Sequence, residues 1–163
     1  MTSPRASFVQ HLNESERLWA VDGSLSRMLL PPEPTGGSHA IVMDQVVRNE
    51  GIPLHRHPGD DETFYIVEGE LEFFFEDGSS VEVHAGDVLF QPGETPHSFR
   101  VNSDEARYLI ITTPRHFAFY RAIGTPAQGD GLPPQQEMDM DKVMAACEAY
   151  GVELVGPPPG MKE

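Results

Sequence analysis

Cysteine, basic residues and long apolar runs are scarce in this sequence, and each scarcity excludes something. The single cysteine, Cys147, excludes a disulfide within the chain. The 11 basic residues face 26 acidic ones, and the resulting net charge of −15 disfavours binding to nucleic acid or to an anionic membrane. There is no run of 18 apolar residues and no charged-then-apolar leader. We therefore expect a cytoplasmic protein without a membrane partner.

Glycine and proline, in contrast, are abundant, with fifteen of each in 163 residues. They break the chain into short segments, which favours strands joined by turns over long helices. Residues 70–76 alternate between apolar and acidic side chains, as expected for a half-buried strand. The fold class is therefore mainly β. We expect seven strands within residues 38–47, 62–69, 70–78, 79–87, 88–93, 96–101 and 106–114.

The length suits one domain with three parts. Residues 1–37 form an N-terminal segment that is partly irregular, 38–125 form the strand-rich body, and 126–163 hold a Gly/Pro loop, a short helix from Met138 to Gly151 and a tail. Phe8, Leu12 and Trp19 have no evident place in the core. We therefore expect the N-terminal segment to contribute to a homodimer.

Two histidines precede a run of acids in the segment IPLHRHPGDDETFYIVEGE, residues 52–70. Alternate residues of a strand face the same side, so His55 and His57 can direct both rings at one metal ion. Such a pair also arises by chance in about one shuffled sequence of four. The context adds Glu62, which opens the next strand, and His97, which follows a Pro-Gly turn.

Two motifs carry a resemblance to the cupin superfamily. Gly51–Gly69, GIPLHRHPGDDETFYIVEG, resembles the first cupin motif, and Gly86–His97, GDVLFQPGETPH, resembles the second. Two departures from these motifs are visible: only three residues separate Gly51 from His55, and Gly93 follows Pro92 directly. Both affect turns and leave the spacing of the ligands intact. The segment after the last strand, with its GTPA turn, resembles the quercetin-dioxygenase-like group of single-domain cupins more loosely.

The resemblance implies a double-sheet jelly-roll barrel with a short C-terminal helix. It also implies that one divalent transition metal is bound by His55, His57, Glu62 and His97. Three imidazoles and one carboxylate suit iron, nickel, manganese, cobalt, copper or zinc. Asp60 and Asp61 are rival carboxylates, but their turn favours solvent and the gap to the second glycine matches Glu62.

Other residues are assigned by strand face and context. Phe64 shares a face with Glu62, and Phe99 shares one with His97, so both are expected beside the metal in a substrate pocket. Phe90 is expected in the core with two other phenylalanines. The remaining histidines, of which His116 is the least certain, are expected at the surface: His11, His39, His84 and His116.

These features favour a metal-dependent enzyme that acts on a small, apolar, oxygen-chelating organic molecule. A dioxygenase-type oxidoreductase is the leading hypothesis, with Glu62 as metal ligand and as catalytic proton acceptor. Two other classes stay open. One is a redox-neutral isomerase, cyclase or lyase that uses the metal as a Lewis acid, and the other is a barrel that binds a small molecule without chemistry.

Overall fold

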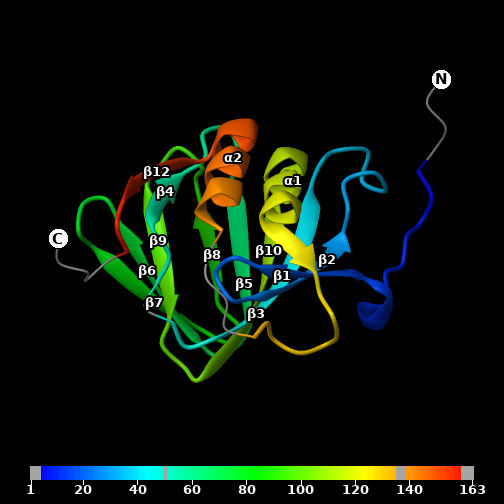
Figure 1. Cartoon of the computed structure of the whole chain (residues 1–163), viewed down its shortest axis with the longest axis horizontal. Helices are drawn as coiled ribbons and strands as arrows, with labels where there is room; N and C mark the ends of the chain where they lie inside the picture. The colour runs from blue at the N-terminus through cyan, green and yellow to red at the C-terminus, as the bar shows by residue number, and fades with distance from the viewer. Residues whose placement is uncertain (1–4, 50, 135–138, 159–163) are drawn as a thin grey trace.

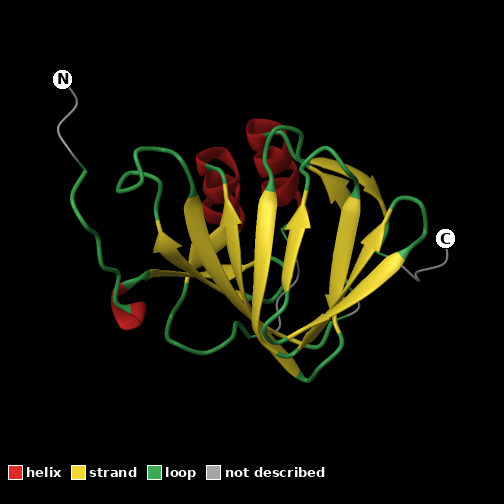
Figure 2. Cartoon of the chain, turned by 180° about the vertical axis from the view of Figure 1, so that it is seen from behind, coloured by secondary structure: helices red, strands yellow, loops and turns green. Residues whose placement is uncertain are grey.

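The strands form two sheets that face each other across one interior. The computed structural model describes residues 5–49, 51–134 and 139–158. The expected helix start at Met138 and the last residues of the tail lie outside these ranges. The larger sheet has seven strands in the order β11-β1-β2-β3-β10-β5-β8, and the smaller has five in the order β12-β4-β9-β6-β7. Figure 1 shows the two sheets, and Figure 2 shows them from behind.

All pairings in both sheets are antiparallel, as in a jelly roll. The larger sheet contains β1 (Glu16–Ala20), β2 (Leu25–Leu30), β3 (Ala40–Val47), β5 (Glu62–Glu68), β8 (Val88–Gln91), β10 (Glu105–Thr112) and β11 (Gly124–Pro126). The smaller contains β4 (Leu54–Arg56), β6 (Glu70–Phe75), β7 (Ser80–His84), β9 (His97–Val101) and β12 (Glu153–Gly156). The predicted fold class is confirmed.

The N-terminal segment contributes more regular structure than we expected. After a short 3-10 helix, η1 (Leu12–Glu14), strands β1 and β2 pair with each other, and β2 pairs with β3. The large sheet thus continues across the boundary that was drawn at residue 38. Trp19 lies in β1, where its Nε1 donates a hydrogen bond to the carbonyl oxygen of Gly131. It is therefore part of the sheet and not of a free segment.

Two helices lie side by side against the barrel in Figure 1, where only one was expected. Helix α2 (Met140–Tyr150) is the predicted C-terminal helix, capped by Asp139 and ended by Gly151 in the left-handed conformation. Helix α1 (Pro114–Ile123) was missed. Its start is a known signal, because Thr113 caps the backbone N–H of His116 and proline takes the first helical position. Neither helix is long and apolar enough to span a membrane.

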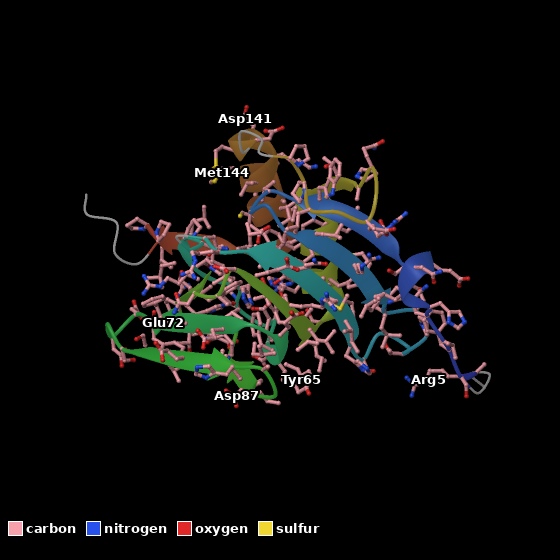
Figure 3. All side chains as sticks on the ribbon, turned by 90° about the horizontal axis from the view of Figure 1, so that it is seen from below. Arg5, Tyr65, Glu72, Asp87, Asp141 and Met144 are labelled. Atoms are coloured by element: carbon pink, nitrogen blue, oxygen red, sulfur yellow. The ribbon has the colours of Figure 1, made fainter. Side chains whose placement is uncertain are left out.

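The core lies between the sheets and is built from inward-facing strand residues. An aromatic cluster dominates it, with ring centroids between 4.9 and 5.9 Å apart, formed by Phe64, Phe73, Phe99 and Tyr108. Phe90, expected in the core, is 60% exposed on the edge strand β8, because its neighbour Gln91 takes the inward position. Tyr65 and Asp87 project outward in Figure 3, as do Asp141 and Met144 from α2.

Candidate metal centre

Both sheets contribute side chains to one cluster inside the barrel. His55 lies in β4, His57 directly follows that strand, and His97 begins β9, its neighbour in the smaller sheet. His55 and His97 are register partners. Glu62 begins β5 of the larger sheet. The fold therefore brings together four residues that the sequence supplies from two separate motifs.

Hydrogen bonds on the far side of each ring fix which nitrogen faces the cluster. Each Nδ1 lies within 2.9 Å of a backbone carbonyl oxygen, that of Pro53 for His55, of Asp60 for His57 and of Thr95 for His97. A carbonyl oxygen can only accept, so each Nδ1 carries the hydrogen. In its neutral form each ring therefore presents the lone pair of Nε2 to the interior, the arrangement that metal-binding histidines need.

The inward atoms are spaced as the ligands of one cation would be. The Nε2 atoms of His57 and His97 are 3.2 Å apart, and Oε2 of Glu62 lies 3.1 Å from the first and 3.5 Å from the second. Adjacent ligands bound at about 2.1 Å from one ion are about 3 Å apart. Without hydrogens between them, these electron-rich atoms repel one another. The residues therefore fit a divalent transition metal, and the cluster can hold one.

A fifth residue, His116 of α1, joins this cluster against expectation. It is 1% exposed, and its Nε2 lies 3.1 Å from Oε1 of Glu62. Its ring packs on that of His57 at 4.1 Å between centroids and stacks on Phe119. The prediction that His116 lies at the surface is wrong. His11, His39 and His84 are exposed as expected.

Tyr120 is the other functional residue that sequence reasoning missed. Its hydroxyl donates a hydrogen bond to Oε1 of Glu62 at 2.8 Å. His116 and Tyr120 are four residues apart on α1, so they share one helix face. The Thr-Pro pair at the start of α1 was the available sequence signal. A helix that begins there places the side chains of His116 and Tyr120 on the same face. Glu62 thus has one oxygen toward the histidine pair and the other toward α1.

These contacts explain the protonation of the cluster. Burial alone would raise the pKa of Glu62, but the neighbouring His116, His57 and His97 hold it well below the usual range, so Glu62 is a carboxylate. Burial and the neighbouring His97 lower the pKa of His55 to about 3, which keeps its ring neutral. Burial opposes charge on His57 as well, yet the hydrogen bond and charge of Glu62 raise its pKa overall. Burial and the charge of Glu62 raise the pKa of Tyr120 well above its ordinary value.

The loop between His57 and Glu62 is fastened to α1 through Asp60. The carboxylate of Asp60 is 2% exposed. Its Oδ2 accepts a hydrogen bond from Arg115 at 2.7 Å, and its Oδ1 accepts one from Thr113. Its backbone oxygen holds His57. The expectation that Asp60 faces solvent is therefore wrong, whereas Asp61 is exposed and accepts from the backbone of Gly93.

A cavity of about 280 Å³ opens beside the cluster. His55 and Glu62 lie at its wall, together with His116 and Tyr120 from α1. Much of the remaining wall is apolar and includes Ile52, Phe99, Ile123 and Val143. Phe99 lines the cavity, and its expected place in a substrate pocket stays a prediction. Phe64 is fully buried and packs behind Phe99 at 5.7 Å between ring centroids.

Comparison with known proteins agrees with this architecture. Residues 43–112 match the cupin domain family model, which confirms the family resemblance. The chain is 28% identical over 152 residues to quercetin 2,3-dioxygenase of Bacillus subtilis (strain 168), which covers 92% of this chain and 44% of that protein. It is 34% identical over 90 residues to polyketide synthase CurC of Streptomyces cyaneus, which covers 54% of this chain and 58% of that protein. The chain thus spans about half the length of these two relatives.

A solved structure extends the likeness of fold to most of the chain. The polyketide cyclase RemF from Streptomyces resistomycificus superposes with a TM-score of 0.57 at 17% identity, covering 86% of this chain and 99% of that one. At this identity the likeness concerns the fold alone. Ligation of a metal by His55, His57, Glu62 and His97 stays a prediction.

Proposed function

We propose that this protein is a metal-dependent oxidoreductase of the dioxygenase type that acts on a small, largely apolar molecule with a chelating enol or phenol. The observation that carries the proposal is the convergence of three imidazoles and one carboxylate beside a largely apolar cavity, whose wall includes His55 and Glu62. The similarity to quercetin 2,3-dioxygenase along 92% of this chain supports the oxidative chemistry.

His55, His57 and His97 would hold the ion as neutral ligands, and Oε2 of Glu62 would complete the set. Once bound, a redox-active ion supplies Lewis acidity at a substrate oxygen and electron exchange with dioxygen. The mostly apolar wall excludes water and favours a flat organic ring system over a phosphorylated sugar. Of the four proposed ligands, His55 and Glu62 line the cavity, so a substrate there would lie beside the ion.

Glu62 is proposed to accept the proton of the substrate. Tyr120 donates to Oε1, and His116 Nε2 lies at hydrogen-bonding distance from the same atom, so the carboxylate is held in one orientation. These contacts also lower its basicity. Glu62 can therefore take a proton only from an acidic hydroxyl, such as that of an enol or phenol, and not from an ordinary alcohol. The proposed substrate class is therefore narrowed to enols and phenols.

Replacing Glu62 by Gln tests this role. An amide oxygen with three imidazoles still coordinates metal, whereas the base is lost, so we expect most of the metal to remain and turnover to fall about 100-fold or more. Wild type and Glu62→Gln would be loaded with the same metal, and occupancy, dioxygen uptake and loss of a flavonol would be followed. Glu68→Gln, at the exposed end of the same strand, is the matched control and should behave as wild type.

Two outcomes would change the proposal. Full turnover in a metal-loaded Glu62→Gln protein would make Glu62 a structural ligand only. A wild-type protein that binds flavonols but consumes neither them nor dioxygen would not be a dioxygenase.

A redox-neutral cyclase, isomerase or lyase is the second candidate. The arrangement of Glu62, His116 and Tyr120 favours it, because an acid and a base within 3.1 Å of one another suit proton shuttling without dioxygen. The 34% identity with a polyketide synthase component adds support. Turnover that continues in the absence of dioxygen would identify this class.

A further inference from the structure

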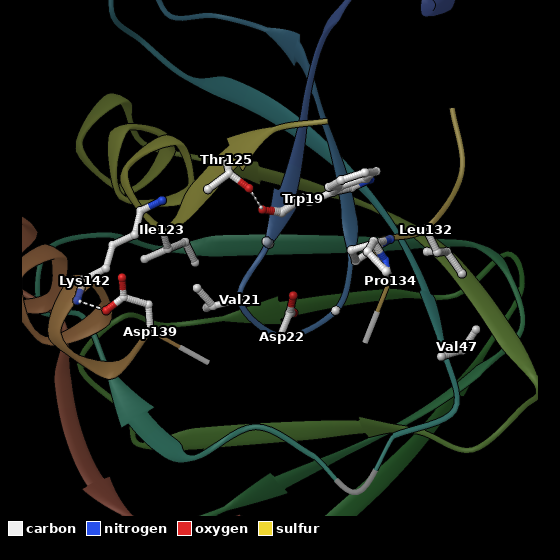
Figure 4. A pocket seen from close by; sticks show the side chains of 13 residues that line it. Trp19, Val21, Asp22, Val47, Ile123, Thr125, Leu132, Pro134, Asp139 and Lys142 are labelled. Atoms are coloured by element: carbon white, nitrogen blue, oxygen red, sulfur yellow. Dashed lines mark hydrogen bonds between the residues drawn. The ribbon is translucent and has the colours of Figure 1, made fainter. Parts of the chain in front are cut away.

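The cavity beside the metal centre continues toward a second, outer pocket. This outer pocket has a volume of about 700 Å³ and is lined by Trp19, Leu132 and Lys142 among others. Figure 4 shows it, with Val21, Asp22 and Ile123 labelled. These three residues also line the inner cavity. The two spaces therefore adjoin at these residues, and Asp22 borders both.

A row of polar side chains leads from Asp22 into the barrel. Oδ1 of Asp22 accepts hydrogen bonds from the backbone N–H and the hydroxyl of Ser24. The hydroxyls of Ser24 and Ser26 are 3.5 Å apart, and Ser26 donates to Oδ1 of Asp44 at 2.6 Å. Ser24, Ser26 and Asp44 are each no more than 3% exposed. The row ends at Asp44, which lines the inner cavity, as Glu62 does.

Nothing cationic balances these acids. Among the described residues, no basic side chain lies within 4.0 Å of Asp22 or Asp44. Burying a carboxyl without a cation is unfavourable by several kcal/mol for the charged form. A buried acid without a cationic partner is therefore unusual at this position.

A second polar group beside Asp44 lacks a partner. Asp44 of β3 is the register partner of Tyr108 in β10 and of Ser26 in β2. The three side chains therefore lie in a row on one face of the sheet. Tyr108 is fully buried, and its hydroxyl has no hydrogen-bond partner within the described ranges. A buried hydroxyl without a partner is rare. Tyr108 is not among the residues that line the cavity, so this hydroxyl lies within the wall and not at its surface.

We propose that Asp44 is a substrate-binding subsite that hydrogen-bonds the far end of a molecule whose chelating oxygen lies at the metal centre. The inference rests on the proposed function, because both ends of one ligand must occupy the same cavity. Oδ1 of Asp44 is taken by Ser26, which leaves Oδ2 for the ligand. The fitting class is a chelating enol or phenol with an apolar frame and a distal hydroxyl or carbonyl oxygen.

The protonation of Asp44 agrees with this role. Burial, followed by the charge of Asp22, raises the pKa of Asp44 to about 8. At neutral pH its carboxyl is therefore mostly a neutral acid, which donates a hydrogen bond to a ligand oxygen. A ligand carbonyl or hydroxyl oxygen could accept this hydrogen bond at the cavity wall, where Asp44 lies.

The test measures binding without turnover. Wild type, Asp44→Leu and Asp44→Asn would be loaded with zinc, which has no redox chemistry, and their zinc contents measured. Dissociation constants would then be determined for unsubstituted flavonol and for two derivatives, each with one added hydroxyl at an opposite end of the molecule. Asp104→Leu, at an exposed turn, is the matched control.

We expect wild type to bind one hydroxylated derivative about 5- to 10-fold more tightly than flavonol, as for one added hydrogen bond. Asp44→Leu should lose this preference while its zinc content and its affinity for flavonol stay unchanged. Asp44→Asn should keep the preference, because its amide still donates. Should Asp44→Leu fail to fold, Asp44→Ala removes the same carboxyl and should lose the same preference.

Each other result has a defined meaning. Equal affinity of wild type for the three ligands, or an undiminished preference in Asp44→Leu, overturns the subsite and leaves the proposed function standing. If none of the three ligands binds zinc-loaded wild type, the chelating substrate itself is wrong, and the subsite falls with it.

Discussion

Two buried carboxyl groups in this barrel have opposite protonation states because their neighbours differ. Glu62 lies among imidazoles, and their presence outweighs burial, so its pKa falls well below the usual range. Asp44 has one hydroxyl donor, Ser26, and the acidic Asp22 nearby, so burial followed by the charge of Asp22 raises its pKa to about 8. Environments that separate two acids in this way are typical of active sites, where one group accepts a proton and the other donates a hydrogen bond.

The raised pKa of Asp44 predicts how stability depends on pH. An acid with a folded pKa of about 8 and an unfolded pKa of 3.8 binds more protons in the folded state between these values. Its contribution to the free energy of unfolding is therefore complete below pH 3.8 and is lost as pH rises to 8. The amide of Asp44→Asn does not titrate. As pH rises from 5 to 8, the unfolding free energy of this variant should therefore increase by about 2–4 kcal/mol relative to that of wild type.

Urea unfolding of zinc-loaded wild type and Asp44→Asn at both pH values measures this difference. A gap in unfolding free energy that stays constant from pH 5 to pH 8 would show that Asp44 is ionised in the folded protein.

At the scale of elements, the position of His57 depends on the loop that follows β4, which is held between the turn at Gly93 and helix α1. The loop that carries His57 is bound on one side to α1 through Asp60, and on the other side its backbone packs against Gly93. The N–H of His57 donates to the carbonyl oxygen of Gly93 at 2.8 Å. Gly93 has no room for a side chain, because an added Cβ would collide with the carbonyl oxygens of His57 and Asp60.

Gly93→Ala should therefore displace the His57 loop and weaken the metal centre. We expect a loss of about 1–3 kcal/mol in unfolding free energy, as for overpacking against rigid backbone, with at least a 10-fold loss of metal affinity. Gly78→Ala is the control for stability alone, since its Cβ would meet no atom and only its φ of +82° is unfavourable, whereas Gly93 has no such φ. Metal titration and thermal unfolding of both variants provide the comparison. Unchanged metal affinity in Gly93→Ala would mean that this packing does not position His57.

The same elements show what sequence could and could not predict. The seven expected strands correspond to β3 and β5–β10, because alternating apolar residues and Gly/Pro turns are local signals. His55, His57, Glu62 and His97 could be chosen because motif spacing is also local. His116 and Tyr120 could not, because their contact with Glu62 depends on α1 folding back over the barrel. The fastening of Asp60 by Arg115 likewise joins residues 55 positions apart.

At the scale of the whole molecule, the surface is acidic and retains exposed apolar side chains. Phe8 and Leu12 are 45% and 49% exposed, and on β8, an edge strand of the large sheet, Val88 and Phe90 are 64% and 60% exposed. An open edge with apolar residues favours pairing with another chain. The expected homodimer therefore has two candidate surfaces, the N-terminal segment and the face of β8.

Light scattering at micromolar concentration tests the dimer. A homodimer should give a mass of about 36 kDa, twice the 18.0 kDa of the chain. Replacing both Phe8 and Leu12 by Ser should shift the mass toward the monomer if the N-terminal segment is the contact, whereas Phe90→Ser should do so if β8 is. A wild-type mass of about 18 kDa would contradict the homodimer prediction.

The metal content of the purified protein tests the central claim most directly. Elemental analysis should find one divalent transition-metal ion per chain in wild type, and less than about one tenth of that in a folded His57→Ala, His97→Ala double variant, because two of four ligands are gone. His84→Ala, which removes an exposed histidine, should keep the wild-type content. Full occupancy in the double variant would contradict the assignment of the metal centre to this cluster.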